Sequence, residues 1–393
     1  MSASPPRVSF LVPTITSPVL GPVTVIGKIL ARHLPVQIIG PDLGGGVCPM
    51  YRGYFDYTVV PTPRIYRLPD WLWESRRLGC AITGDIIFAV KAFAETLPVA
   101  LREKRRRGAK VVAYLDEWDG ALWARLTARE KLASALRHFH HPSTELWHPF
   151  WERQLRHADM VTSTTTFLQH KFGGRILHMG VDTDLFRPAA PERVAALRGE
   201  VKAGDRRLLV FGGVVRPHKG VELILDSLVA LGDPSVALLV VGPETDHLKA
   251  LRAHAAYAPF LLCAGEQPKE RMPEYLSLAD AIVLPLRNDP LAHSQMPCKI
   301  FEAMAMGKPM IGSAVADLPE VLNGCGWVVP PDNPNAIADR LRWIFSNPAE
   351  AAAAGAALRQ RCVERYSQVV TERALLAIVR DLTGWSPPAG LPR

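Results

Sequence analysis

The clearest chemistry in the sequence lies between Leu208 and Gly220. A strand-like apolar run there enters a turn containing Gly212 and Gly213, and Arg216 and Lys219 follow before a helical pattern begins. Glycine lets backbone N–H groups approach an anion, a helix start adds partial positive charge, and two cations supply charge-assisted hydrogen bonds. The segment predicts a phosphate site, with a solvated basic turn as the alternative.

A second segment, residues 291–311, places Lys299 and Glu302 near the start of a predicted helix. Because residues three apart share a helix face, the two side chains are expected to lie together. Gly307 and Pro309 then end the helix and return the chain to a strand. Glu302 is of the type that accepts hydrogen bonds from ribose hydroxyls in nucleotide sites. A solvated glutamate on a helix face is the alternative.

An acidic cluster follows a strand-like run in the first half of the chain. The run from Val111 ends in Asp116, and Glu117 and Asp119 come directly after it. Carboxyl ends of strands are where α/β proteins collect their sites. Asp116 could stabilise positive charge on a reacting sugar or orient an acceptor hydroxyl, with Asp119 and Trp118 beside it. The alternative is that an aspartate caps a helix.

Tryptophans alternate with basic residues in the region 118–157. Four of them, Trp118, Trp123, Trp147 and Trp151, stand among arginines and five histidines. This mixture suits an anionic membrane interface or a lipid-linked acceptor. An ordinary helical lid with core tryptophans is the alternative, and the histidines have no metal-site spacing.

The elements that must position these residues alternate between strands and helices. Predicted strands are 8–12, 36–39, 86–90, 110–115 and 160–163, and then, after a linker at Pro188–Pro191, 208–211, 237–241, 260–263, 281–284, 309–311 and 327–329. Short runs that are apolar on both faces are typical of parallel sheets covered by helices. Two α/β domains are therefore expected, residues 1–187 and 188–367, followed by a helical pattern from Ala349 to Leu382.

Composition limits the class of protein. A chain of 393 residues with 48% hydrophobic residues predicts two packed domains, and a net charge of +8 favours anionic partners. No nucleic-acid-binding pattern is present, so that partner is not expected. The longest apolar stretch, 81–101, is interrupted by Asp85, Lys91 and Glu95, and the N-terminus does not resemble a signal peptide, so a cytoplasmic location is expected. Six scattered cysteines predict buried, reduced thiols.

Taken together, the segments resemble the GT-B glycosyltransferases, and within them the retaining family four, the glycosyl transferases group 1. The matching pieces are Lys219–Gly220, Val240–Gly242, Ala264–Glu266, Met272–Asp280, Phe301–Pro309 and Leu318–Glu320, preceded by Ala158–Thr162 and Gly180–Pro188. The likeness covers the C-terminal two thirds well and the first 150 residues in outline. It implies two Rossmann-like, doubly wound domains facing a central cleft, with a helix at about 368–393 packed back on the first domain.

The resemblance also implies roles for individual residues. Arg216 and Lys219 would neutralise the donor diphosphate opposite Gly21, and Glu302 would contact the ribose. The remaining donor-side candidates are Gly212, Gly213, His293, Ser294, Gln295, Met296 and Lys299. A metal is not expected, because the cations stabilise the diphosphate.

The sequence departs from the family pattern at three positions. Gly213 stands where the family has arginine, Ser294 where it has the first glutamate of a pair, and Asp116 where it has the active-site histidine. The sugar-facing loop is therefore atypical, and the donor sugar cannot be carried over from the family.

The predicted function is transfer of a sugar from a nucleotide-diphosphate sugar, UDP- or GDP-linked, to an acceptor hydroxyl with retention of configuration. The acceptor is expected to be a sugar or glycolipid of the cell envelope, reached by peripheral contact with the inner membrane surface. The alternatives are a GT-B sugar-nucleotide epimerase and a non-catalytic nucleotide-sugar-binding protein. A nicotinamide dehydrogenase is disfavoured, because Gly44–Gly46 does not form a GxGxxG turn after the first strand.

Overall fold

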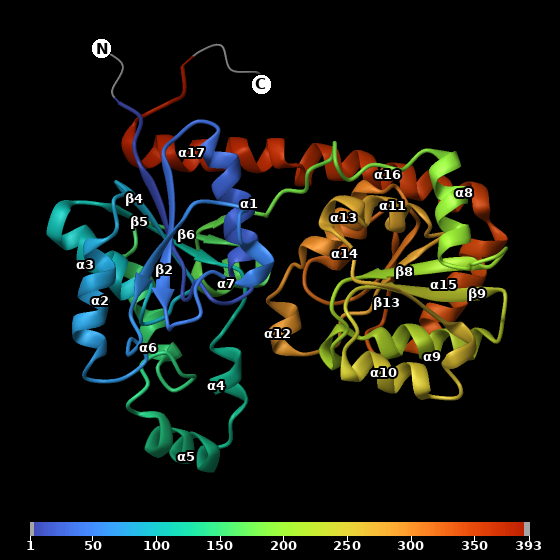
Figure 1. The fold of residues 1–393 in the computed structure, drawn as a ribbon, viewed down its shortest axis with the longest axis horizontal. Coiled ribbons are helices and arrows are strands. Elements are labelled where there is room, and N and C mark those ends of the chain that lie inside the picture. Colours follow the sequence, from blue (N-terminus) through green and yellow to red (C-terminus); the bar gives the residue numbers. More distant parts are fainter. Residues whose placement is uncertain (1–3, 389–393) are drawn as a thin grey trace. The chain divides into compact units, whose positions relative to one another are not determined.

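The chain forms two compact units. A computed structural model describes residues 4–388, and unit 1 contains the chain up to Gly180 together with the segment from Gln368, whereas unit 2 is Val181–Ser367. Both units are built on parallel strands covered by helices, as the alternating sequence pattern predicts (Figure 1).

Unit 1 contains a parallel sheet of seven strands in the order β3-β2-β1-β4-β5-β6-β7. The strands are β1 (Val8–Leu11), β2 (Val36–Asp42), β3 (Tyr57–Pro61), β4 (Ile86–Val90), β5 (Lys110–Leu115), β6 (Met160–Ser163) and β7 (Arg175–Ile176). The order reverses between β1 and β4, which run in register from Val8 opposite Ile86. In a doubly wound sheet this reversal opens a crevice at the carboxyl ends of the two strands.

Helices cover both faces of this sheet. The helices of unit 1 are α1 (Leu20–Ala31), α2 (Trp71–Cys80), α3 (Leu97–Arg107), α4 (Ala121–Arg125), α5 (Ala128–His138), α6 (His148–Arg153), α7 (Thr166–Phe172) and α17 (Gln368–Thr383), and of these α4 and α5 project away from the sheet (Figure 1). Alternate residues of β5 enter different cores: Val112 and Tyr114 pack with α1 and α17, while Val111 and Ala113 pack with α2 and α3. The apolar run is therefore buried on both faces.

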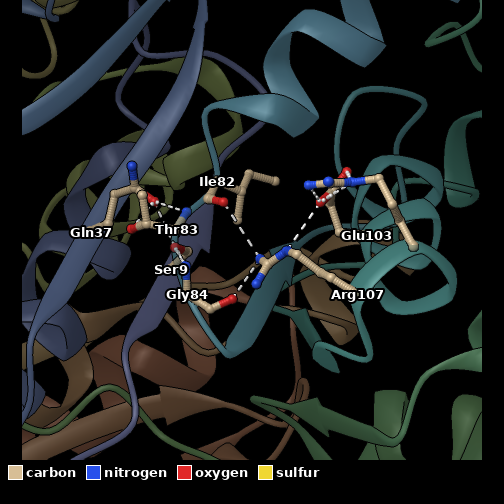
Figure 2. A network of polar contacts seen from close by, with 8 residues as sticks. Ser9, Gln37, Ile82, Thr83, Gly84, Glu103 and Arg107 are labelled. Carbon is tan, nitrogen blue, oxygen red and sulfur yellow. Dashed lines mark hydrogen bonds and ion pairs between the residues drawn. The ribbon is translucent and has the colours of Figure 1, made fainter.

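A polar network fixes the amino-terminal edge of the sheet (Figure 2). Ser9 of β1 donates to Gln37 of β2 at 2.6 Å and accepts from the backbone N–H of Gly84 at 2.9 Å. Arg107 of α3 donates to the Gly84 carbonyl at 2.6 Å, and buried Glu103 accepts from the same guanidinium at 3.1 Å. The network joins β1, β2, α3 and the turn before β4, away from the strand ends that carry the chemistry.

Unit 2 also consists of parallel strands whose order reverses once. Its strands are β8 (Arg207–Gly212), β9 (Val236–Val241), β10 (Leu261–Gly265), β11 (Ile282–Leu284), β12 (Met310–Ser313) and β13 (Trp327–Val329). They form the sheets β10-β9-β8 and β11-β12-β13, joined by a parallel bridge between Leu209 and Ala281. The reversal between β8 and β11 again predicts a crevice at the carboxyl ends.

The helices of unit 2 fill the intervals between these strands. They are α8 (Pro191–Glu200), α9 (Val221–Leu231), α10 (Asp246–Ala253), α11 (Met272–Ser277), α12 (Pro290–His293), α13 (Cys298–Ala305), α14 (Leu318–Leu322), α15 (Pro334–Ser346) and α16 (Pro348–Tyr366). A short 3₁₀ turn, Pro217–Lys219, precedes α9.

The long helical pattern near the C-terminus is two helices rather than one. Ser367 has an extended backbone between α16 and α17 and pairs with Val181. Helix α17 lies along α1, where Glu372 pairs with Arg32 at 3.0 Å and with His33 at 2.8 Å. Periodicity alone does not detect such a break, because the apolar residues continue on both sides of it.

Three expectations need correction or completion. The edge strands β3 and β7 were not predicted, because β3 is largely exposed and β7 has two residues. The six cysteines are free, but Cys80 and Cys263 are exposed, so the expectation of buried thiols fails for these two. Among residues 4–388, the structure contains no helix with the length and apolar character needed to span a membrane.

Candidate active site

The predicted phosphate turn lies at the carboxyl end of β8, at the reversal point of unit 2. Gly213 has φ +109, a conformation that favours glycine, and a Cβ built on it would lie 2.6 Å from Nζ of Lys299. The Lys299 ammonium also lies 4.6 Å from the ring centre of Phe211. Where the family pattern has arginine after the first glycine, this chain therefore places a lysine from α13.

Cations and one carboxyl group meet at this turn. Burial, together with the positive charge of Lys219, lowers the pKa of Lys299 to about 8, while Glu302 opposes the shift. Burial raises the pKa of Glu302, against the effect of Lys269 and Lys299. The structure thus brings together Lys219, Lys299 and Glu302, which the sequence analysis proposed from separate segments. Clustered cations in a poorly solvated turn suit an anion with more than one charge.

The loop between β8 and α9 is pressed against the end of β11. Gly220 has φ +69, and a Cβ there would collide with the carbonyl of Pro285, which follows β11. Arg216 precedes the 3₁₀ turn in an extended conformation and is exposed. Gly212 ends β8, and a Cβ on it would lie 2.6 Å from Cε of Met272. Glycines therefore allow the close approach of the phosphate turn, β11 and α11.

The atypical sugar-facing loop is built around α12. Asp289 caps this helix, accepting from the backbone N–H groups of Leu291 at 2.8 Å and Ala292 at 3.0 Å. The His293 ring lies 2.9 Å from the Asn288 side-chain oxygen, and its Nδ1 accepts from the Ala316 N–H at 3.4 Å. The ring is thus fixed by backbone and amide groups.

The next three residues differ in exposure. Ser294 is fully buried, and its hydroxyl donates to the Leu291 carbonyl at 2.8 Å. Met296 is buried in the core of unit 2, whereas Gln295 is half-buried. A serine that closes its own helix turn leaves His293 and Gln295 as the more accessible side chains of this loop.

In unit 1, Gly21 lies in the first turn of α1. Its backbone N–H donates to the Pro18 carbonyl at 3.0 Å, and a Cβ built on it would lie 2.5 Å from the hydroxyl oxygen of Tyr51. A side chain at this position would displace the Tyr51 phenol. The glycine therefore permits a close aromatic contact over the helix start.

The acidic cluster after β5 surrounds a lysine that the sequence analysis did not propose as a site residue. Lys91 follows β4, has φ +64 and is only 6% exposed. Its ammonium pairs with Glu117, with Asp119 at 2.8 Å and with Asp116 at 3.8 Å. Neither aspartate caps a helix, since α4 begins after Gly120 and has no side-chain cap.

Burial controls the protonation of this cluster. It raises the pKa of Asp119 to about 7 and raises that of Asp116, while the charge of Lys91 works in the opposite direction. Burial also disfavours the charged form of Lys91, but the three carboxylates outweigh it and raise the lysine pKa. A carboxyl group with a pKa of about 7 can accept or donate a hydrogen bond to a hydroxyl near neutral pH. Within the described residues, no group of three or more His, Cys, Asp or Glu is arranged to hold a metal ion.

A pocket of about 280 Å³ opens beside the cluster, near the lower end of the size range of ligand sites. Its lining residues are Pro13, Thr14, Ser17, Val19, Tyr66, Lys91, Phe93, Glu95, Asp119, His141 and Ser143. Glu95 is 1% exposed and accepts from the Ser143 hydroxyl, and burial raises its pKa to about 7. Tyr66 and His141 stack with ring centres 5.0 Å apart. Carboxyl groups beside a flat ring pair suit a polyhydroxylated ligand.

Trp118, the other acceptor-side candidate, is engaged in a different contact. Its indole N–H donates to Glu152 at 3.0 Å, and the Lys171 ammonium lies 4.1 Å from its ring centre. Burial raises the pKa of Glu152, opposed by Lys171. Trp118 thus anchors the turn after β5 to α6 and α7.

Comparisons with known proteins agree with this geometry. A family model described as "Glycosyl transferases group 1" matches residues 205–347, the part of unit 2 that contains the phosphate turn and Glu302. The GDP-mannose-dependent alpha-(1-6)-phosphatidylinositol monomannoside mannosyltransferase of Mycolicibacterium smegmatis is 28% identical over 79% of this chain and 80% of its own. The D-rhamnosyltransferase WbpZ of Pseudomonas aeruginosa is 28% identical over 58% of this chain and 59% of its own.

Solved structures show the same fold. HepE of Anabaena, in complex with UDP and glucose, has a TM-score of 0.71 at 16% identity and covers 95% of this chain and 99% of its own. A glycosyltransferase from Rickettsia africae has a TM-score of 0.73 at 17% identity, covering 97% of this chain and 99% of its own. These findings support a glycosyltransferase with the GT-B fold. The mycobacterial relative is nucleotide-sugar-dependent by its name, and the epimerase and binding-protein alternatives are not favoured.

Proposed function

We propose that the enzyme transfers a sugar from UDP or GDP to a hydroxyl of a cell-envelope glycolipid or polysaccharide, with retention of configuration and without a metal. The observation that carries the proposal is the meeting of Lys219, Lys299 and Glu302 at the β8–β11 reversal, inside the matched segment. The Mycolicibacterium relative uses GDP-mannose and a phosphatidylinositol mannoside, while HepE was solved with UDP, so both bases remain candidates.

The proposed roles follow from charge and burial. Lys219 and Lys299, with Arg216 on the same loop, neutralise the diphosphate, and Glu302 accepts from the ribose hydroxyls. In unit 1, Asp119 accepts a hydrogen bond from the acceptor, and Asp116 stabilises positive charge on the reacting sugar. The acceptor oxygen bonds to the anomeric carbon as its bond to the diphosphate breaks. The acceptor proton passes to the departing phosphate, which leaves configuration retained.

Thermal stabilisation by a panel of UDP-, GDP-, ADP- and dTDP-sugars tests donor binding. A ligand at a hundred times its dissociation constant adds about 2.7 kcal/mol. We expect a shift with one base, lost in Lys219→Ala and in Glu302→Ala. Lys249→Ala is the control, because Lys249 is exposed on α10 and pairs only with exposed Asp246. No shift with any donor would refute donor binding, and a product of inverted anomeric configuration by NMR would refute retention.

We also propose that α5 rests on an anionic membrane surface. Leu132, Leu136 and Phe139 are 64%, 80% and 62% exposed. Their spacing of four and three residues places them on one face. Arg129 and Arg137 on the same helix are exposed and add positive charge, and α4 and α5 project from the rest of unit 1 (Figure 1). An apolar face flanked by cations suits anionic lipid headgroups.

The tryptophans that first suggested a membrane contact have mainly structural contacts. Trp151 is buried and donates to the Pro142 carbonyl at 2.7 Å, and Trp147 donates to the Phe139 carbonyl at 3.3 Å. The membrane proposal therefore rests on α5 and not on these indoles.

Flotation with phosphatidylglycerol vesicles tests this contact. Wild-type protein is expected to float, and Leu132→Ser/Leu136→Ser to stay in solution. The control Val229→Ser/Val363→Ser removes two exposed apolar side chains from unit 2 and should float like wild type. Equal flotation of both double variants, or none of the wild type, would refute a role for α5. A positive result would support location at the cytoplasmic surface of the inner membrane.

A further inference from the structure

A second pocket adjoins the acidic one in unit 1. It measures about 560 Å³ and is lined by Pro63, Arg64, Tyr66, Arg67, Leu68 and His140. Tyr66 lines both pockets, and His140 of the second is followed in the chain by His141 of the first. The two pockets therefore adjoin at Tyr66, whose ring stacks on His141.

The wall between the pockets is held in place by hydrogen bonds. The Leu68 N–H donates to the His140 carbonyl at 2.7 Å, and the Tyr66 hydroxyl donates to the Pro13 carbonyl at 3.2 Å. The Arg67 N–H donates to the Arg64 carbonyl at 3.0 Å, which makes a turn that presents both guanidinium groups from one short loop. None of these hydrogen bonds uses an arginine side chain, so they persist when an arginine is replaced by glutamine.

The two pockets contain different charged groups. The first contains Glu95 and Asp119 with Lys91. In the second, Arg64 lies 3.8 Å from Asp70 and is 68% exposed, and Arg67 has no ion-pair partner in the described part of the chain. Guanidinium groups present paired donors that match phosphate oxygens. Carboxylates accept from sugar hydroxyls and repel phosphate.

Resting on the proposed function, we propose that the acceptor is a phosphodiester-linked sugar that spans both pockets. The accepting sugar lies against Tyr66 and His141 and hydrogen-bonds Glu95 and Asp119, and its phosphate binds Arg64 and Arg67. A neutral glycoside would fill only the first pocket. A second phosphate, placed on a ring hydroxyl that faces Glu95 and Asp119, would be repelled by these carboxylates.

Direct binding to the full-length protein tests the proposal without requiring turnover. The probes are an octyl glycoside, the matching octyl glycosyl phosphate and inorganic phosphate, in gluco and manno forms of the sugar, titrated by calorimetry in physiological salt. We expect the phosphodiester probe to bind at least about tenfold more tightly than the glycoside, because charged hydrogen bonds to phosphate add to the sugar contacts. Inorganic phosphate alone is expected to bind more weakly than the phosphodiester probe.

Arg64→Gln/Arg67→Gln should reduce the affinity of the phosphodiester probe to that of the neutral glycoside. Arg76→Gln/Arg77→Gln removes the same charge from exposed positions on α2 and should keep the preference. Equal affinities in wild type, or a preference that survives in Arg64→Gln/Arg67→Gln, would overturn the proposal. Inorganic phosphate binding as tightly as the diester would overturn the two-pocket acceptor in favour of a simple anion patch.

Vesicles of phosphatidylcholine with and without phosphatidylglycerol separate a lipid surface from a single acceptor phosphate. Loss of vesicle binding in Arg64→Gln/Arg67→Gln, with its probe preference intact, would show that the arginines meet the membrane and would overturn the acceptor site. The nucleotide-sugar thermal shift is measured on the same preparations. A retained shift without probe preference refutes only this inference, whereas a missing shift in wild type refutes the proposed function.

Discussion

Replacing Lys91 by methionine tests how the acidic cluster is held together. Methionine keeps a chain of similar length and faces the same backbone restriction at φ +64, so the variant chiefly removes the charge. Lys91 is 6% exposed and pairs with three carboxylates whose side chains are 20–26% exposed. Breaking a buried ion pair costs about 3–5 kcal/mol, because the partner charge stays buried without compensation. We expect a loss of that size in unit 1 near pH 8.

The pH dependence gives a sharper test. A carboxyl group whose folded pKa is raised contributes stability that is present below its unfolded pKa and is lost as pH rises through the folded value. Asp119 already has a pKa of about 7, and Asp116 is raised as well. Removing Lys91 raises both pKa values further. Wild type and variant differ little where these carboxyls are protonated in both, so the penalty should grow as pH rises above about 7 and should stay below about 2 kcal/mol near pH 5.

Native-state hydrogen exchange of peptides from β4 and β5 measures this loss in unit 1 separately from unit 2. Lys110→Met is the control, because Lys110 is an exposed residue at the start of β5 and its loss should cost less than about 0.5 kcal/mol. A Lys91→Met variant as stable as wild type near pH 8, or equally destabilised at pH 5 and pH 8, would refute the idea that the lysine stabilises the carboxylates.

Three further predictions concern single groups. Glu95→Gln should stabilise unit 1 by about 3 kcal/mol near pH 8 and leave its stability unchanged below pH 4.5, because the raised Glu95 pKa of about 7 costs stability as pH rises through that value. Chemical unfolding at several pH values measures this. A variant that is never more stable than wild type would contradict the prediction. Nucleoside-diphosphate binding near pH 8 should take up about half a proton, because the diphosphate raises the Lys299 pKa from about 8. Calorimetry in buffers of different ionisation enthalpy should detect this proton uptake in wild type and no such uptake in Lys299→Arg. Gly84→Ala should lower the free energy of unfolding by about 1–3 kcal/mol, since the added Cβ would lie 2.5 Å from the Ser9 nitrogen. Gly199→Ala, on an open helix surface, should raise it by about 0.5–1 kcal/mol. Equal unfolding midpoints for the two variants would exclude the steric argument.

The local sequence pattern was sufficient to predict the alternation of parallel strands and helices in both units. Runs such as Ile86–Val90 and Val236–Val241 are apolar on both faces, which is typical of a helix-covered parallel sheet, and both are strands in the structure. The glycine turn before α9 could also be predicted, because glycines and cations follow one another within 13 residues of chain, Leu208 to Gly220; that it binds phosphate stays a prediction. Edge strand β3 was missed because its apolar run is short, and only Val60 of its five residues is buried.

Lys91 and Glu95 illustrate what the sequence alone does not decide. In the chain they only interrupt an apolar stretch, and the carboxylates they act with lie more than 20 residues away. The available signal was their place just after β4, at the reversal of strand order, but that order is set by which strands pair across the sheet.

Gly213 makes the same point for the donor side. The sequence shows a missing arginine, whereas the structure places the Lys299 ammonium at that position from a helix more than 80 residues further along the chain. Periodicity and residue type therefore determined the two α/β units, the glycine turn before α9 and the carboxylate cluster. Only tertiary packing decided which cation faces which carboxylate, because charge pairing and desolvation depend on distances between elements that are remote in sequence.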